Sequence, residues 1–359
     1  MVEARVRVGV ERRRSDDPDP GDRFRGLYAP DSEVDRLLAG TRLPLLPDNP
    51  ATLPDDPAAL PDRPATLPDN PRSQIDELLA AVEADADADE AAGSDLRVRR
   101  VARSFDLTRL DTEVLLVALA PDLDPKFERL YGYLNDDVSR RRASIGLALE
   151  LCGALGPQSG GRARLGPTGP LVDGGLVEVE DPDRPFLTRA LRVPDRVTAH
   201  LLGDDAPDPL VLSVAMPDVD AQVGDTSTLE RSMAAGQRLV YIRQPNGGAG
   251  FSLASAAARR AGLGVLLADL TRLDGGDGDA AFTRRLAREA RLRGCVVVAG
   301  PVEAVADRGA VAVRALAEAR VRTLVLVGGR TWDPSWSRDV PLVVDAPVPT
   351  PVERSLILA

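Results

Sequence analysis

The chain has 359 residues, of which 45 are Lys or Arg and 56 are Asp or Glu, so its formal net charge is −11. This length exceeds the roughly 250–300 residues at which a single core stops growing, which predicts at least two domains. A pI near 4.8 argues against a general binder of nucleic acid or anionic membranes, because such binding needs a positive field. The sequence has no apolar run of membrane-spanning length and no signal-peptide core, so we expect a cytoplasmic protein.

The cysteines and the single histidine limit the chemistry. Cys152 and Cys295 lie in separate apolar segments, which indicates buried, reduced thiols rather than a disulfide. A zinc site needs about four ligands, more than these residues can easily supply, so we expect no metal. His200 would have to serve any His-based triad, but no G-x-S-x-G motif accompanies it. We therefore interpret His200 as a structural residue.

The first 72 residues divide into an N-terminal helical segment over 1–40 and a proline-rich linker over 41–72. Val34 and Leu38 follow Asp31–Ser32 at helical spacing, which predicts a short capped helix. The linker repeats the pattern L-P-D-x-P-A-x, and two prolines per repeat prevent the coiled coil that its leucine spacing alone would predict. We expect an extended, polyproline-like spacer; the alternative is a ligand for an aromatic-lined groove.

The region 73–215 has a mainly helical pattern. Its first apolar stripe runs into the acidic segment EADADADEA, which we interpret as a solvated loop. The run from Thr108 to Asp111 predicts a capping box that opens the third helix, and Asp124–Pro125 and Ser144 begin the fourth and fifth. The segments LVDGGLVEVE and PFLTRALRV predict a short β-ribbon. Helices followed by such a ribbon indicate a winged-helix-like domain.

A DNA-binding role for this domain is one hypothesis. Its third helix would lie where a DNA reader places its recognition helix, and Arg140, Arg141 and Arg142 would add positive charge. However, a nucleic-acid module normally carries a basic field over its whole docking face, whereas this domain is otherwise acidic. We favour a protein-interaction module and keep a DNA-binding winged-helix regulator as an alternative.

The region 220–359 alternates strands with helices. Near-continuous apolar strands of this kind predict a parallel sheet that is covered on both faces. The predicted strands are Arg238–Arg243, Gly264–Asp269, Cys295–Ala299, Thr323–Val327 and Pro341–Asp345, and the predicted helices are Ser252–Ala261, Ala280–Leu292 and Ala310–Ala319.

A glycine-rich loop after the first of these strands predicts a P-loop NTPase core. A working loop follows G-x-x-x-x-G-K-[ST], in which amides cradle the phosphates and the lysine neutralises their charge. Here Phe251 stands in the lysine position and Pro245 in that of the first glycine. The residues that remain as a weak or vestigial ATP-binding set are Gly247, Gly248, Gly250 and Ser252.

The ends of two later strands lack the polar residues of an active NTPase. The third strand ends in Ala299–Gly300 where an Asp-Glu pair should hold magnesium and polarise water. The fourth ends in Gly328–Gly329 where a polar sensor residue is expected. Three catalytic positions are therefore lost together, so we predict no ATP hydrolysis by this chain and no cofactor other than weakly bound ATP.

Four segments resemble a known family: DPDPGDRFRGLYAPDSEVDRLL, RVARSFDLTRLDTEVLLVALAPDLDPKFERLYGYLNDD, VTAHLLGDD and WDPSWSRDVPLVVDAPVPTPVER. They look like parts of the AAA+ ATPases encoded beside extracellular contractile injection systems. The resemblance covers most of the chain except the proline repeat, and APDLDPKFERLYGYLNDD is its most specific element. It implies a winged-helix region, a degenerate first ATPase module and a second module with intact nucleotide motifs. We expect the lid of the first module and the whole second module to be absent, since the sequence stops at Ala359.

The resemblance also implies a role for Arg338. In AAA+ rings an arginine finger lies just before the fifth strand and reaches the site of a neighbouring subunit, and Arg338 occupies that place. We favour the alternative interpretation, a surface arginine paired with Asp333 or Asp339. We interpret Trp332 and Trp336 as aromatic packing beneath the last loop rather than as a ligand platform.

The sequence therefore predicts a multidomain α/β and α+β protein. A helical winged-helix-like domain precedes a five-stranded parallel P-loop NTPase-like (AAA+) core over 220–359. The favoured function is that of a catalytically degenerate assembly or regulatory partner linked to a contractile injection system. We expect protein partners, including an active AAA+ subunit and injection-system components, and neither membrane nor nucleic acid. The alternatives are an ATP-binding AAA+ ATPase and the DNA-binding regulator.

Overall fold

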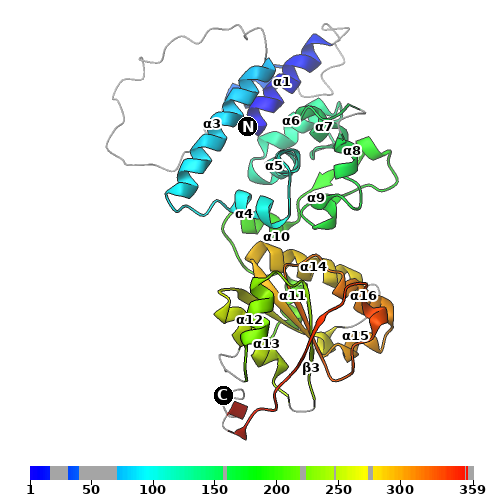
Figure 1. Cartoon of the computed structure of the whole chain (residues 1–359). Helices are drawn as coiled ribbons and strands as arrows, with labels where there is room; N and C mark the ends of the chain where they lie inside the picture. Colours follow the sequence, from blue (N-terminus) through cyan, green and yellow to red (C-terminus); the bar gives the residue numbers. More distant parts are fainter. Residues whose placement is uncertain are drawn as a thin grey trace. The chain divides into compact units, whose positions relative to one another are not determined.

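The computed structural model describes residues 1–16, 31–39, 71–156, 160–218, 224–245, 248–273, 278–351 and 353–354. The chain divides into two compact units (Figure 1). Unit 1 comprises Met1–Leu96, Thr108–Gly166 and Val177–Val193, and unit 2 comprises Arg97–Leu107, Pro167–Leu176 and Pro194–Ala359. The two units are thus interleaved along the sequence. The predicted linker lies outside the described residues except for Pro71 and Arg72.

Unit 1 is a helical bundle with a two-stranded ribbon. Its helices are α1 (Val2–Ser15), α2 (Asp31–Ala39), α3 (Pro71–Ala91), α5 (Arg109–Leu123), α6 (Lys126–Leu134), α7 (Ile145–Leu151) and α8 (Gly161–Arg164). Strands β1 (Glu178–Val179) and β2 (Leu191–Arg192) pair antiparallel, on either side of the 3-10 helix η2 (Phe186–Thr188). The predicted helices and ribbon of this region are confirmed.

Side-chain caps set where two of these helices begin. Thr108 Oγ1 accepts a hydrogen bond from the Asp111 N–H at 3.3 Å, and Asp111 Oδ2 accepts one from the Thr108 N–H at 2.8 Å. This reciprocal pair is the capping box predicted at the start of α5. The hydroxyl of Ser144 accepts from the Leu147 N–H at 3.1 Å and caps α7, as predicted.

The prediction of a solvated loop at EADADADEA was wrong, because α3 continues through it to Ala91. Alanine is the strongest helix former and alternates here with acidic residues that can remain in solvent on a helix surface. Helix α3 begins at Pro71, in agreement with the preference for proline in a first turn. The charge run therefore marks an exposed helix rather than a break between helices.

The first helix belongs to the core of unit 1. Val6 and Val10 on α1 are buried, and α1 contacts α5, α6 and α7. Arg5 forms a buried ion pair with Glu113 of α5 at 2.7 Å, and its Nη1 donates to the Leu151 carbonyl at the end of α7 at 2.7 Å. The core of this bundle therefore includes residues from the start of the chain.

Unit 2 is built on a five-stranded sheet that is parallel throughout, with the order β4-β5-β6-β3-β7. The five predicted strands are confirmed to within two residues. They are β3 (Leu239–Arg243), β4 (Gly264–Asp269), β5 (Cys295–Gly300), β6 (Leu324–Gly328) and β7 (Leu342–Asp345). The first strand of the sheet thus lies between the fourth and the fifth.

Helices cover both faces of this sheet, as Figure 1 shows. One face packs against α12 (Ser227–Ala234) and α13 (Gly250–Arg260). The other packs against α11 (Pro209–Val214), α14 (Gly278–Arg293), α15 (Glu303–Ala306) and α16 (Ala310–Ala317), together with the 3-10 helices η3 (Leu270–Arg272) and η4 (Pro334–Trp336). Helices α4 (Arg97–Ser104), α9 (Pro170–Asp173) and α10 (Asp195–Leu201) complete unit 2. The predicted two-sided cover is confirmed.

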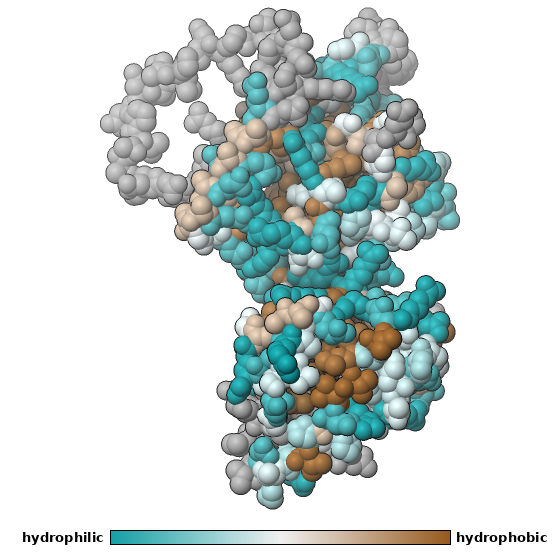
Figure 2. All heavy atoms as spheres, viewed as in Figure 1, coloured by the Kyte–Doolittle hydropathy of each residue, from teal (hydrophilic) through white to brown (hydrophobic). Residues whose placement is uncertain are grey.

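The surface of unit 2 is not uniformly polar. On the face seen in Figure 2, hydrophobic residues gather in the middle of this unit. Val311, Val340 and Val343 are exposed hydrophobic residues of unit 2. Within the described part of the chain, the helices fall short of the length and apolar character that a bilayer crossing requires.

Candidate functional site

The topology of the sheet places a crevice at its carboxyl edge. The chain leaves β3 for α13 on one face and leaves β6 for η4 on the other, although β3 and β6 are neighbours. Open α/β sheets bind ligands at such a switch point. A pocket of about 520 Å³ lies there, lined by Gln244–Pro245, Phe251, Pro301, Glu303 and the turn Gly328–Arg330.

The loop between β3 and α13 uses its amide groups internally. The side-chain oxygen of Gln244 accepts a hydrogen bond from the Gly250 N–H at 2.8 Å, at the start of α13. The Gly248 N–H donates to the Pro245 carbonyl at 2.8 Å, and the Ala249 N–H donates to the Pro347 carbonyl at 3.1 Å. In a phosphate-binding loop, amides at a helix N-terminus are directed at the anion instead. Oxygen atoms of the chain itself therefore take the place of such an anion.

Close packing explains the glycines of this loop. A Cβ atom at position 250 would lie 2.7 Å from Gln244 Oε1 and 3.0 Å from Val327, and one at position 248 would lie 2.8 Å from the Gln244 side chain. Gly248 and Gly250 therefore make room for Gln244. Gly247 lies outside the described residues. Ser252, the remaining member of the predicted ATP-binding set, is buried on α13.

Phe251 fills the position that a phosphate-binding lysine would occupy in the sequence pattern. Its side chain is partly buried against the core on the α13 face of the sheet. A Cβ atom at Gly300 would lie 3.2 Å from the tip of the phenyl ring, so the ring reaches the end of β5. The aromatic ring thus lies across the carboxyl edge between α13 and β5.

Glu303 is a residue of this crevice that the sequence analysis missed. Its Oε1 accepts hydrogen bonds from the Gly329 and Arg330 N–H groups at 2.7 and 2.9 Å. The carboxylate thereby occupies the amides that follow β6. An acidic residue three positions after the end of β5 was the available signal. Gln244, directly after β3, was also missed, because it lies just before the first position that the P-loop pattern defines.

Aromatic residues pack at the turn after β6. Tyr241 donates its hydroxyl hydrogen to the Arg330 carbonyl at 2.6 Å, and burial, with a contribution from Glu303, raises the pKa of Tyr241 to about 12. The ring centroids of Tyr241 and Trp332 are 5.3 Å apart, as are those of Trp332 and Trp336. The interpretation of the two tryptophans as aromatic packing is confirmed.

Arg338 is exposed directly before β7. The expectation that it pairs with Asp333 or Asp339 was wrong. Asp339 pairs with Arg238, whose Nε lies 3.0 Å from Asp339 Oδ2, and Asp333 accepts the Ser335 N–H at 2.8 Å. No ion pair of Arg338 is found among the described residues.

The arginines suggested for DNA contact in unit 1 are each matched by an acid. Arg140 lies 3.1 Å from Asp137, Arg141 lies 3.6 Å from Glu128, and Arg142 lies 3.3 Å from Asp122. The third predicted helix, α5, is buried over most of its length. Its single arginine, Arg109, lies 3.0 Å from Glu113. This helix therefore does not present a basic face.

The surroundings of the histidine and of the cysteines indicate structural roles. His200 is fully buried on α10, with Nδ1 2.7 Å from Asp205, and burial lowers the pKa of the imidazole despite this carboxylate. Cys295 is buried, and burial raises the pKa of the half-buried Cys152 thiol to about 12. Among the described residues, no group of three or more His, Cys, Asp or Glu side chains is arranged to hold a metal ion.

Comparison with protein families identifies the larger part of the chain. Residues 1–215 match the family described as winged helix domain, variant. This match covers more than half of the 359 residues, so the chain belongs to this family. A search of the curated proteins found no match. The five-stranded parallel sheet of unit 2 fits an NTPase-like α/β core.

Proposed function

We propose that this protein is a catalytically degenerate member of the AAA+ class that acts as an assembly or regulatory partner, linked to a contractile injection system. The observation that carries the proposal is that side chains of the protein itself lie in the carboxyl-edge crevice and accept hydrogen bonds from its amides. Gln244 and Glu303 place their own oxygen atoms on the amides beside the pocket, and Phe251 lies across it. The link to injection systems depends on the sequence resemblance alone.

The loss of catalytic groups supports a non-hydrolytic role. Phosphoryl transfer depends on a cation at the phosphates and on acids that hold magnesium and orient water. The only lysine of the chain, Lys126, lies in unit 1, with Nζ 3.5 Å from Glu3 and 3.4 Å from Asp124. The strand β5 ends in Gly300, and Glu303, the acid that lines the crevice, is engaged by two amides. The cation that lines the crevice, Arg330, lies 2.8 Å from Asp307, so both charged side chains of the crevice already have partners in the chain.

The rival functions fit the surroundings of these residues less well. An active ATPase would need free amides at the start of α13, where Gln244 now accepts a hydrogen bond. A DNA-binding regulator would need α5 to present basic side chains, but that helix is buried and its arginine is paired. A winged helix domain that contacts another protein needs neither feature.

Nucleotide turnover and binding test the degenerate core directly. Purified full-length protein is expected to show no magnesium-dependent ATP turnover, and calorimetry is expected to give a dissociation constant no tighter than about 1 mM, or roughly −4 kcal/mol. Phe251→Lys should improve ATP binding if the loop retains its shape, with Arg338→Ala as a control outside the crevice. Turnover that persists through purification and disappears in Ser252→Ala would contradict the proposal, as would micromolar affinity.

Purification from the native host tests the partner role. We expect the tagged chain to retain an ATPase subunit together with injection-system components, because the proposal assigns hydrolysis to another chain. If that subunit depends on an arginine supplied in trans, Arg338→Ala should lower its turnover without weakening its association. A chain that co-purifies with DNA and with no ATPase would instead support the regulator alternative.

A further inference from the structure

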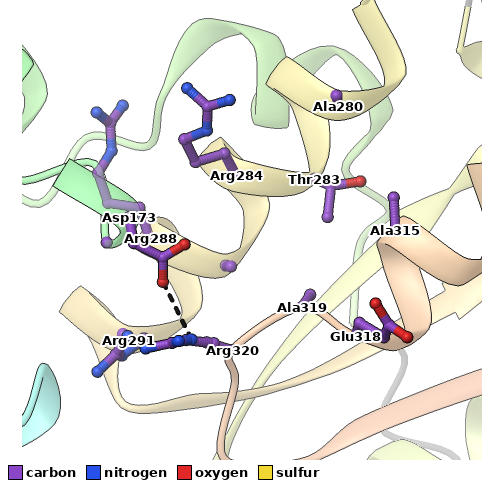
Figure 3. Close-up of a pocket in the computed structure, with 12 residues that line it drawn as sticks. Asp173, Ala280, Thr283, Arg284, Arg288, Arg291, Ala315, Glu318, Ala319 and Arg320 are labelled. Carbon is purple, nitrogen blue, oxygen red and sulfur yellow. Dashed lines mark ion pairs between the residues drawn. The ribbon is translucent and has the colours of Figure 1, made fainter. Parts of the chain in front are cut away.

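A second pocket of unit 2, with a volume of about 240 Å³, is lined by arginines (Figure 3). Arg284, Arg288 and Arg291 come from α14, and Arg320 comes from the segment after α16. The three residues on α14 are spaced at i, i+4 and i+7, so they share one face of the helix. Like charges at this spacing oppose helix formation, and the chain as a whole carries a net charge of −11. The pocket therefore gathers four arginines beside two acidic lining residues, Asp173 and Glu318.

Two of these arginines are held in place by neighbouring groups. The Arg288 side chain is only 6% exposed, its Nη2 lies 2.8 Å from Asp208, and its Nη1 donates to the Gly175 carbonyl at 3.1 Å. Arg291 donates from Nε to the Ser104 carbonyl at 2.7 Å, its Nη2 lies 3.6 Å from Asp106, and its guanidinium carbon lies 4.1 Å from the centre of the Phe105 ring. Fixed guanidinium groups lose less side-chain entropy when they bind an anion.

The other two arginines are more exposed. Arg320 lies 3.0 Å from Asp173, the ion pair drawn as a dashed line in Figure 3. Arg284 is exposed, and no ion pair of its guanidinium is found among the described residues. Burial lowers the pKa of Arg291, and the neighbouring Arg320 acts in the same direction. An anion between these side chains would relieve that repulsion.

We propose that this pocket binds a phosphate group, either as inorganic phosphate or as a phosphate monoester of a small molecule. Guanidinium groups match the oxygen geometry of phosphate and form charge-assisted hydrogen bonds with it. A singly charged carboxylate gains little here, because Asp173 already supplies one to Arg320. The volume of about 240 Å³ is below the roughly 300 Å³ at which typical ligand pockets begin, which suits one phosphate with a small substituent.

The test is calorimetry on the full-length protein with inorganic phosphate and with glycerol phosphate, at constant ionic strength. We expect the double variant Arg284→Ala/Arg320→Ala to bind phosphate at least about tenfold more weakly than the wild type, equivalent to about 1.4 kcal/mol. Arg293→Ala, which removes an exposed charge of α14 outside the pocket, is the matched control and should leave binding unchanged. Tighter binding of the ester than of phosphate would identify the monoester as the ligand class, and the reverse would identify inorganic phosphate.

Asp173→Asn provides a change of opposite sign. It removes the carboxylate that competes for Arg320, so phosphate should bind more tightly, whereas Asp307→Asn, which alters an exposed ion pair of Arg330, should have no such effect. The proposal is overturned if neither phosphate nor its ester binds at millimolar concentration. It is equally overturned if the double variant and Arg293→Ala reduce binding by the same factor, since that would show a non-specific charge effect.

Discussion

The carboxyl-edge crevice and the arginine pocket of unit 2 differ in how far the chain itself provides acceptors for their hydrogen-bond donors. In the crevice, the chain supplies its own acceptors, because Gln244 caps the first amide of α13 and Glu303 accepts from the turn after β6. The arginine pocket is lined by four arginines, of which Arg288 and Arg291 are held by Asp208 and Asp106, whereas Arg284 and Arg320 are exposed. At the edge where an α/β sheet ordinarily binds its ligand, these amides thus donate to side chains of the chain itself. The exposed guanidinium groups lie instead at the arginine pocket, beside α14.

The largest change in the free energy of unfolding is expected for a buried ion pair of unit 2. Arg196 and Glu289 form a two-point ion pair at 2.8 and 2.9 Å, and both side chains are at most 6% exposed. Glu289→Ala would leave the Arg196 charge buried and unpaired, so the free energy of unfolding should fall by about 3–5 kcal/mol. Denaturant titration measures this change. Glu318→Ala, on the exposed end of the neighbouring α16, is the control and should unfold close to the wild type.

A smaller effect is expected from Gln244→Ala at the crevice. This substitution removes the acceptor of the Gly250 N–H, and losing a helix cap typically costs about 1 kcal/mol. It also frees an amide for an anion, so ATP binding should strengthen slightly rather than weaken. Calorimetry and denaturant titration on the same protein separate the two effects. An unchanged stability would indicate that water replaces Gln244 without cost.

The pH dependence of stability tests another internally matched group, His200. Burial lowers the pKa of this imidazole in the folded protein below its ordinary value of about 6.5. The unfolded chain therefore binds the proton first as the pH falls, and the free energy of unfolding should decrease below about pH 6.5, by no more than about 1.4 kcal/mol per pH unit. Unfolding titrations between pH 7.5 and 5 measure the slope. A His200→Gln variant should lack this component, and an equal slope in both proteins would contradict the assignment.

The smallest effect is expected for Arg338→Ala. The residue is exposed and makes no ion pair among the described residues, so Tm should stay within about 2 °C of the wild type. Differential scanning calorimetry is sufficient. A larger fall would show that Arg338 has a structural role, which would remove the main reason to consider it for action on a neighbouring subunit.

Local patterns predicted local structure well. The apolar runs of unit 2 gave all five strands, and the polar residues Thr108 and Ser144 marked the first turns of α5 and α7. The same reasoning was wrong at the acidic segment, where alanine propensity outweighed charge and α3 continued to Ala91. It also did not predict that Gln244 and Glu303 accept hydrogen bonds from backbone N–H groups. The donors belong to other parts of the fold, the start of α13 and the turn after β6.

The sequence by itself determined most of the secondary structure, the parallel sheet, the winged-helix character of residues 1–215 and the presence of Phe251 at the lysine position of the P-loop pattern. These properties depend on residue type and short-range spacing. Only the tertiary structure decided that Glu303 meets the turn after β6, and that Arg320 joins the arginines of α14 at one pocket. Such groupings depend on strand order and helix packing, which bring residues tens of positions apart within reach of each other, and no local pattern in the sequence encodes those distances.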